Sequence, residues 1–286
     1  MKVARPAGTP PTVGQNLRSR LRRLLEVPAG GGSVRPGWGP VPIAAAMVGV
    51  AFWWVETPTV WPWPYLPVLL VVGAVLAGCW WVVARRDGLQ LARLTAPDMG
   101  AVLLWFGVAG VASSVLAVVF DSGLQSPFTP ADSPGFAVVQ TVVVSVATAV
   151  VEEATAAAVV LAAAALIALR RPWTGWAPWI GIVVGAAYRV ALHVPLWGSE
   201  AVIRCGFALI MAWLFWRLRR IWPLIVGHVL WDIPPVLSQV TPAASVSAAM
   251  IWLSQLWCVA GLAAAVSVFL IVRPDRSLRG RSLNRG

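Results

Sequence analysis

The sequence predicts an all-α, polytopic membrane protein of about eight transmembrane helices, with the N- and C-termini in the cytoplasm. Composition, the length of the apolar runs and the distribution of arginine each support this fold class. The apolar residue types AVILMFWYC make up 59% of the 286 residues, and charged residues make up 12%. Soluble domains average about 45–50% apolar and about 25% charged residues. The composition therefore indicates a helical membrane domain.

The apolar runs divide into candidate spans. A helix needs roughly 20 residues to cross the hydrocarbon core, because its backbone polar groups must be satisfied within the helix. The first run is short and ends in aromatic residues typical of the membrane interface. The fourth is longer than one crossing requires, so we expect it to be tilted or to begin at the membrane surface. The predicted spans are 41–55, 65–84, 99–120, 137–169, 177–196, 200–217, 221–237 and 246–272.

Basic residues alternate from one side of these spans to the other. With the N-terminus inside, 20 of the 22 basic residues fall in inner segments, as the positive-inside rule expects. The predicted outer connections carry Glu56, Asp121 and Asp132 instead. A miscounted span would destroy this alternation, so the arginines support eight spans independently of hydropathy.

The same pattern divides the chain into a disordered basic cytoplasmic tail at 1–40, a membrane domain at 41–272 and a second basic cytoplasmic tail at 273–286. The net charge is +11, but the arginines lie between apolar segments. The expected partner is therefore the lipid bilayer and not nucleic acid. The Ala-, Val-, Arg- and Trp-rich composition suggests a bacterium with a GC-rich genome, and so a bacterial plasma membrane.

Ionisable side chains occur inside the predicted spans. Each costs on the order of 2.5–3.5 kcal/mol at the bilayer centre, so such a group is by default part of a functional site that faces the bundle interior. The group includes both histidines of the chain. Its members are Glu152, Glu153, Arg189, His193, Glu200, Arg204, His228 and Asp232.

Helical spacing sorts these residues. Glu152 and Glu153 are adjacent and point about 100° apart, which predicts different roles for them. Arg189 and His193 are four residues apart, so they share one face of the fifth span.

Two further pairs have the same spacing of four. His228 and Asp232 share one face of the seventh span. Glu200 and Arg204 lie near the outer boundary, where we expect an intrahelical ion pair with no other role.

This set of residues could activate a water molecule. Glu152 could act as a general base. His193, His228 and Asp232 could hold a divalent metal such as zinc together with Glu152, or could hydrogen-bond a developing oxyanion. Glutamate, histidine and arginine also form the proton relays of transporters, although no inverted repeat or pair of Gly/Pro-broken helices is evident.

The order of these residues resembles the CPBP group of intramembrane proteases, also called CAAX-protease and bacteriocin-processing (Abi) proteins. That family carries Glu-Glu-x-x-x-Arg, Phe-x-x-x-His and His-x-x-x-Asn or Asp on three membrane helices. The corresponding segments here are EEATAA at 152–157, RVALH at 189–193 and HVLWD at 228–232. The resemblance covers about residues 137–237.

The resemblance implies an intramembrane endopeptidase that hydrolyses a peptide or membrane-anchored protein. Glu152 would activate the water, with Glu153, His193 and His228 in the catalytic centre. Asp232 would help to bind a metal or the oxyanion. Whether the family uses zinc or a metal-free glutamate is left open by the sequence.

Two positions depart from the family pattern. Ala157 stands where the first motif has arginine, and Arg189 stands where the second motif has phenylalanine. One hypothesis is that the cation has moved to the neighbouring helix, where Arg189 pairs with Glu153. The alternative is a catalytically inactive member of the family that serves as a bacteriocin-immunity or partner-binding membrane protein.

Overall fold

The computed structural model describes residues 37–56, 75, 78, 82, 96–120, 134–170, 175–240 and 244–272. Within these residues the chain forms seven α-helices, one 3-10 helix and no strand. The helices are α2 (Pro40–Glu56), α4 (Ala96–Val119), α5 (Pro134–Arg170), α6 (Ala177–Trp197), η2 (Gly198–Arg204), α7 (Cys205–Leu218), α8 (Trp222–Val240) and α9 (Ala244–Val272).

These helices confirm the predicted all-α membrane fold. Seven of the predicted spans correspond to helices whose ends differ by a few residues, and the span at 65–84 falls outside the described part of the chain except for residues 75, 78 and 82. Among the residues that the structure describes, four helical segments are long and apolar enough to cross a membrane: Met99–Val119, Ser145–Arg170, Ala177–Pro195 and Gly198–Leu218. The count of eight and the orientation of the termini stay predictions, as do the two tails.

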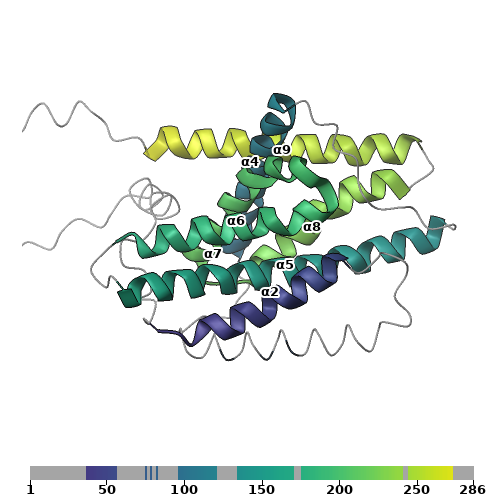
Figure 1. Ribbon diagram of the computed structural model, residues 1–286. Helices are drawn as coiled ribbons and strands as arrows, with labels where there is room; N and C mark the ends of the chain where they lie inside the picture. Colours follow the sequence, from purple (N-terminus) through teal and green to yellow (C-terminus); the bar gives the residue numbers. More distant parts are fainter. Residues whose placement is uncertain are drawn as a thin grey trace, which may run out of the picture.

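Helix α5 forms the centre of the bundle. It is 37 residues long and rich in alanine, the residue with the highest helix propensity, and its alanines pack in the buried core. It contacts α2, α6, α7 and α8. Figure 1 shows α2, α5 and α6 running side by side, while α9 lies against α4 on the other side of the bundle.

Small residues bring α6 close to α5. Gly181 and Gly185 are four apart on α6, the small-xxx-small spacing of closely packed membrane helices. A Cβ atom at Gly181 would lie 2.6 Å from the backbone oxygen of Val160 on α5. The close approach continues one turn further along α6, at Arg189, which can therefore reach across to α5.

The connections after α6 and α7 set the register of the site helices. Helix α6 contains Pro195 in its last turn and is capped by Gly198, whose φ of 57° is favourable for glycine. Helix α7 ends at Arg219 in the left-handed conformation, with φ 53°. Pro223 then follows in the first turn of α8, where its missing N–H leaves no helical hydrogen bond unmade. This turn places His228 less than two turns inside α8.

We predict that Gly181→Ala destabilises the bundle by about 1–3 kcal/mol, because the added methyl group forces α6 away from α5. Unfolding in detergent micelles would measure the change. Gly49→Ala on α2 is the control, because a Cβ there meets nothing within 4 Å. Equal stability of the two variants would contradict the close contact of α5 and α6.

Candidate active site

The structure brings the six predicted site residues together between three helices. Glu152 and Glu153 lie midway along α5. Arg189 and His193 come from α6, and His228 and Asp232 come from α8. The direct contacts among these residues join all three helices at one place.

Glu153 is the centre of this cluster. Its Oε1 accepts a hydrogen bond from Nη1 of Arg189 at 2.8 Å, and its Oε2 lies 2.7 Å from Nη2. His228 donates from Nδ1 to the same Oε1, also at 2.8 Å. The Arg189 and Glu153 side chains are each 2% exposed. The fork of the guanidinium thus meets both carboxylate oxygens, the strongest form of ion pair, and the pair expected between Arg189 and Glu153 is present.

His228 is fixed by contacts to both of its ring nitrogens. While Nδ1 faces Glu153, Nε2 lies 3.3 Å from Oδ2 of Asp232. The ring also packs beside Phe207 and Phe106, with centroid distances of 5.5 and 6.3 Å. Because carboxylate oxygens accept hydrogen bonds, a ring between two of them carries a proton on each nitrogen.

His193 differs from His228 in which of its ring nitrogens carry a proton. Its Nδ1 lies 2.8 Å from the backbone oxygen of Arg189, and since a carbonyl can only accept, Nδ1 carries the proton. In the neutral ring Nε2 therefore presents a lone pair. That atom lies 3.8 Å from Oε1 of Glu152, too far for a direct hydrogen bond.

Glu152 is buried but poorly satisfied. Its Oε2 has no hydrogen-bond partner among the described residues, and Nη1 of Arg189 lies 3.9 Å away. A carboxylate in an apolar bundle normally fills its acceptor sites. The two adjacent glutamates are thus distinguished by their surroundings, with Glu153 fully engaged and Glu152 open.

The side chains are arranged in a way that does not match a protein-held metal. No group of three His, Cys, Asp or Glu side chains within the described segments is placed to hold an ion. Both nitrogens of His228 face carboxylates, and a guanidinium lies beside Glu152. The metal at Glu152, His193, His228 and Asp232 stays a prediction, and the chemistry below follows from the side chains alone.

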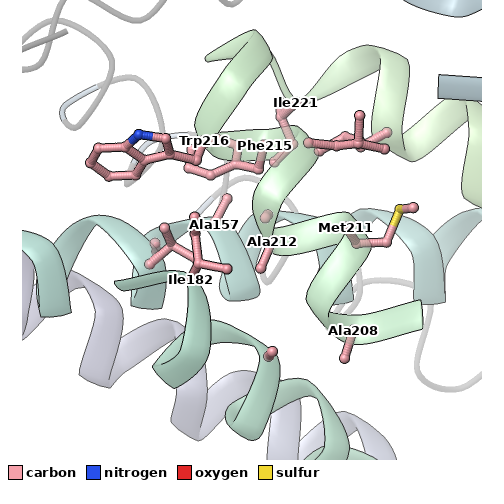
Figure 2. Close-up of a cluster of buried hydrophobic side chains, with 14 of the residues drawn as sticks. Ala157, Ile182, Ala208, Met211, Ala212, Phe215, Trp216 and Ile221 are labelled. Carbon is pink, nitrogen blue, oxygen red and sulfur yellow. The ribbon is translucent and has the colours of Figure 1, made fainter. Parts of the chain in front are cut away.

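Ala157 faces an apolar cluster and not the site. Figure 2 shows it beside Ile182 of α6 and Ala212 of α7, with Phe215 and Trp216 above. A guanidinium at 157 would have to enter this cluster. The cation at Glu153 is supplied instead by Arg189 from the neighbouring helix.

The ion pair predicted between Glu200 and Arg204 is wrong. Residues 198–204 form a 3-10 helix, in which side chains three apart are aligned and side chains four apart are not. Glu200 is exposed, and the Arg204 guanidinium lies over the ring of Trp197, 4.2 Å from its centroid. In the sequence, Pro195 and Gly198 could have indicated that the α-helix ends before Glu200.

Sequence reasoning also missed the aromatic wall of the site. The Arg189 guanidinium lies over the Phe207 ring, with Cζ 5.6 Å from its centroid, and the His228 ring packs against Phe207 in a tilted contact at 5.5 Å. An aromatic face stabilises a neighbouring positive charge. Nothing in the sequence distinguishes Phe207 from the other phenylalanines in apolar runs.

Residues 134–234 match the family described as type II CAAX prenyl endopeptidase Rce1-like. The matched segment makes up about a third of the chain and contains all six site residues. It agrees closely with the range of the resemblance seen in the sequence, 137–237. No curated protein and no solved structure gives a significant match.

We predict strong coupling between Glu153 and Arg189. Glu153→Gln and Arg189→Gln should each destabilise the fold by about 3–5 kcal/mol, since each leaves a buried charge uncompensated. The double variant should lose clearly less than the sum, which a double-mutant cycle of unfolding in detergent would measure. The control cycle pairs Glu153→Gln with Arg170→Gln at the exposed end of α5, where additive losses are expected. Additive losses in the first cycle would contradict the ion pair.

We predict that restoring the arginine of the first motif does not compensate for loss of Arg189. Ala157→Arg should lower the yield of folded protein, because it places a charge in an apolar cluster. Ala157→Met, of similar length but uncharged, should cost less. Recovery of stability in Ala157→Arg combined with Arg189→Ala, judged by thermal unfolding, would show that position 157 can supply the cation.

Proposed function

We propose that this chain, which matches the type II CAAX prenyl endopeptidase Rce1-like family over residues 134–234, is a glutamate-dependent endopeptidase of the membrane. Its substrate would be a peptide or a membrane-anchored protein. The observation that carries the proposal is the state of Glu152, a buried carboxylate that faces Nε2 of His193 and has an oxygen without a hydrogen-bond partner.

The distance between Glu152 and His193 supports water activation. The 3.8 Å between Oε1 and Nε2 is short enough for one water molecule to contact both atoms. Nε2 accepts a hydrogen bond from one O–H of that water and fixes its orientation, and this O–H bond stays intact. Glu152 removes the other proton as the water oxygen attacks the scissile carbonyl carbon. Glu152 then delivers this proton to the leaving amine.

Glu153 has a supporting role in this mechanism. Both of its oxygens are engaged, so it is a poor base. It holds Arg189 beside Glu152, and it holds His228 at the site. His228 and Asp232 border the place where the substrate carbonyl would lie.

The nature of the substrate follows from the setting. A site within apolar helices is reached by segments that enter the bilayer, such as a lipid-modified peptide, a secreted precursor or a membrane protein. We place the enzyme in a bacterial plasma membrane, with the catalytic core at about 137–237 between two basic cytoplasmic tails.

An inactive, partner-binding protein is the second candidate, and Ala157 is the observation that favours it. Loss of the motif arginine would leave Glu153 uncompensated if nothing replaced the charge. Arg189 supplies that charge here, which supports catalysis over binding alone.

We predict that Glu152→Gln abolishes hydrolysis while the protein stays folded, because an amide cannot accept the proton from water. General-base catalysis contributes about 10²–10⁴-fold, so the residual rate should fall by at least about 100-fold. Purified protein in liposomes would be incubated with a peptide and membrane-protein library, and the products read by mass spectrometry.

Glu200→Gln is the matched control, because it makes the same chemical change at an exposed glutamate outside the cluster. Each reaction is repeated with a chelator and with added zinc. Products that persist in Glu152→Gln would overturn the proposed base. Cleavage that the chelator stops and zinc restores would assign the water to a metal.

A further inference from the structure

Arg204 is a cation that the mechanism has not used. It ends η2, the short 3-10 helix between α6 and α7, and its guanidinium stacks on Trp197. Its Nε is buried without a hydrogen-bond partner, and no ion pair of Arg204 is found among the described residues. The exposed Glu200 on the same short helix does not neutralise it.

The stack connects Arg204 to the candidate active site. Trp197 lies between Arg204 and His193, and its ring meets the His193 ring edge-to-face at 6.2 Å. Arg204 also lies within electrostatic range of Asp232 and Glu152. The cation therefore lies on the side of the site formed by His193 and Asp232, and Arg189 approaches Glu152 from α6.

Such a placement is costly for a residue with no function. A cation within membrane helices is normally paired with an acidic side chain or a backbone carbonyl, or reaches the interface. The Trp197 ring offsets part of the cost, by about 0.5–2 kcal/mol for a cation–π contact. Asp232 and Glu152 attract the cation from within the cluster, but neither is hydrogen-bonded to its buried Nε, and that N–H can donate to an anion brought by a ligand.

The reaction creates such an anion. When the water oxygen bonds to the carbonyl carbon, the π electrons of the C=O bond move to oxygen and form an oxyanion. Collapse restores the C=O bond and breaks the C–N bond, and the amine leaves with the proton held by Glu152. The oxyanion needs hydrogen-bond donors, and an ionised Asp232 can only accept.

We infer that Arg204 is the anion-binding residue of this site and takes an anionic oxygen of the peptide substrate. The inference rests on the proposed endopeptidase function. Two substrate groups have this chemistry: the oxyanion at the scissile carbonyl and a free C-terminal carboxylate. A guanidinium binds either one through paired N–H donors, and lysine cannot reproduce that geometry.

The test compares wild type, Arg204→Gln and Arg204→Lys in liposomes, with Glu200→Gln as the control on the same 3-10 helix. Matched thermal unfolding is required of all four proteins. Each is assayed with a peptide library in two forms, one with free C-terminal carboxylates and one amidated. A photo-crosslinking version of both libraries measures binding without turnover.

If Arg204 binds the oxyanion, Arg204→Gln lowers kcat by about 100-fold or more for both forms, and Arg204→Lys recovers little of the loss. If Arg204 binds the C-terminal carboxylate, Arg204→Gln raises KM only for peptides with a free C-terminal carboxylate. Photo-crosslinking of these peptides to the variant then falls to the level seen with the amidated peptides.

Two results would overturn the inference. Unchanged kcat and KM in Arg204→Gln for both peptide forms would do so while leaving the endopeptidase function intact. The absence of cleavage by wild type, together with equal capture of acids and amides, would overturn both proposals. Loss of folding in Arg204→Gln alone shifts the comparison to Arg204→Lys, which must then show the same loss of kcat or rise in KM.

Discussion

The bundle depends on one buried carboxylate, Glu153. An ionised side chain inside apolar helices is tolerated when its oxygens are hydrogen-bonded and its charge is compensated. Here the compensation comes from two other helices, through Arg189 of α6 and His228 of α8. The relative positions of α5, α6 and α8 are thereby constrained at one point. The close approach at Gly181 makes this reach possible, because it lets α6 lie almost against the α5 backbone.

The chemical difference between the two adjacent glutamates follows from this constraint. Neighbouring residues on a helix point about 100° apart, so Glu153 can face Arg189 while Glu152 faces His193. The cations that satisfy Glu153 leave no donor in hydrogen-bonding contact with Oε2 of Glu152. Glu153 thus binds the neighbouring helices, and Glu152 keeps an oxygen without a hydrogen-bond partner. A site for proton transfer requires both conditions, because a base that was itself part of the structural ion pair could not accept a proton without breaking it.

Much of this arrangement is predictable from the sequence, because lipid makes ionisable residues conspicuous. The helix ends follow from hydropathy and from the positions of arginine. The six site residues follow from their rarity within apolar runs and their spacing of one or four. Contacts that depend on how the backbone turns cannot be predicted from the sequence in this way. Residues 198–204 leave the α-helical repeat, so Arg204 stacks on Trp197 instead of pairing with Glu200. The contact of Phe207 with Arg189 was not predictable, since nothing in the sequence indicates which aromatic residue of an apolar run lies beside a cation.

Because the cation beside Glu153 comes from Arg189 on α6 and not from position 157 on α5, it can do more than compensate a charge. An arginine at 157 would lie one turn from Glu153 on α5, and an ion pair between them would be local to that helix. Arg189 instead ties α6 to α5, so the charge compensation depends on the helix contact. The same turn of α6 carries His193, whose Nδ1 is held by the backbone oxygen of Arg189 itself. The tautomer that leaves Nε2 free to accept from water is therefore set by the residue that neutralises Glu153. Arg189 and His193 lie one turn apart on α6, so a movement of α6 that weakens the ion pair also changes the distance between His193 and Glu152 on which the proposed water activation depends.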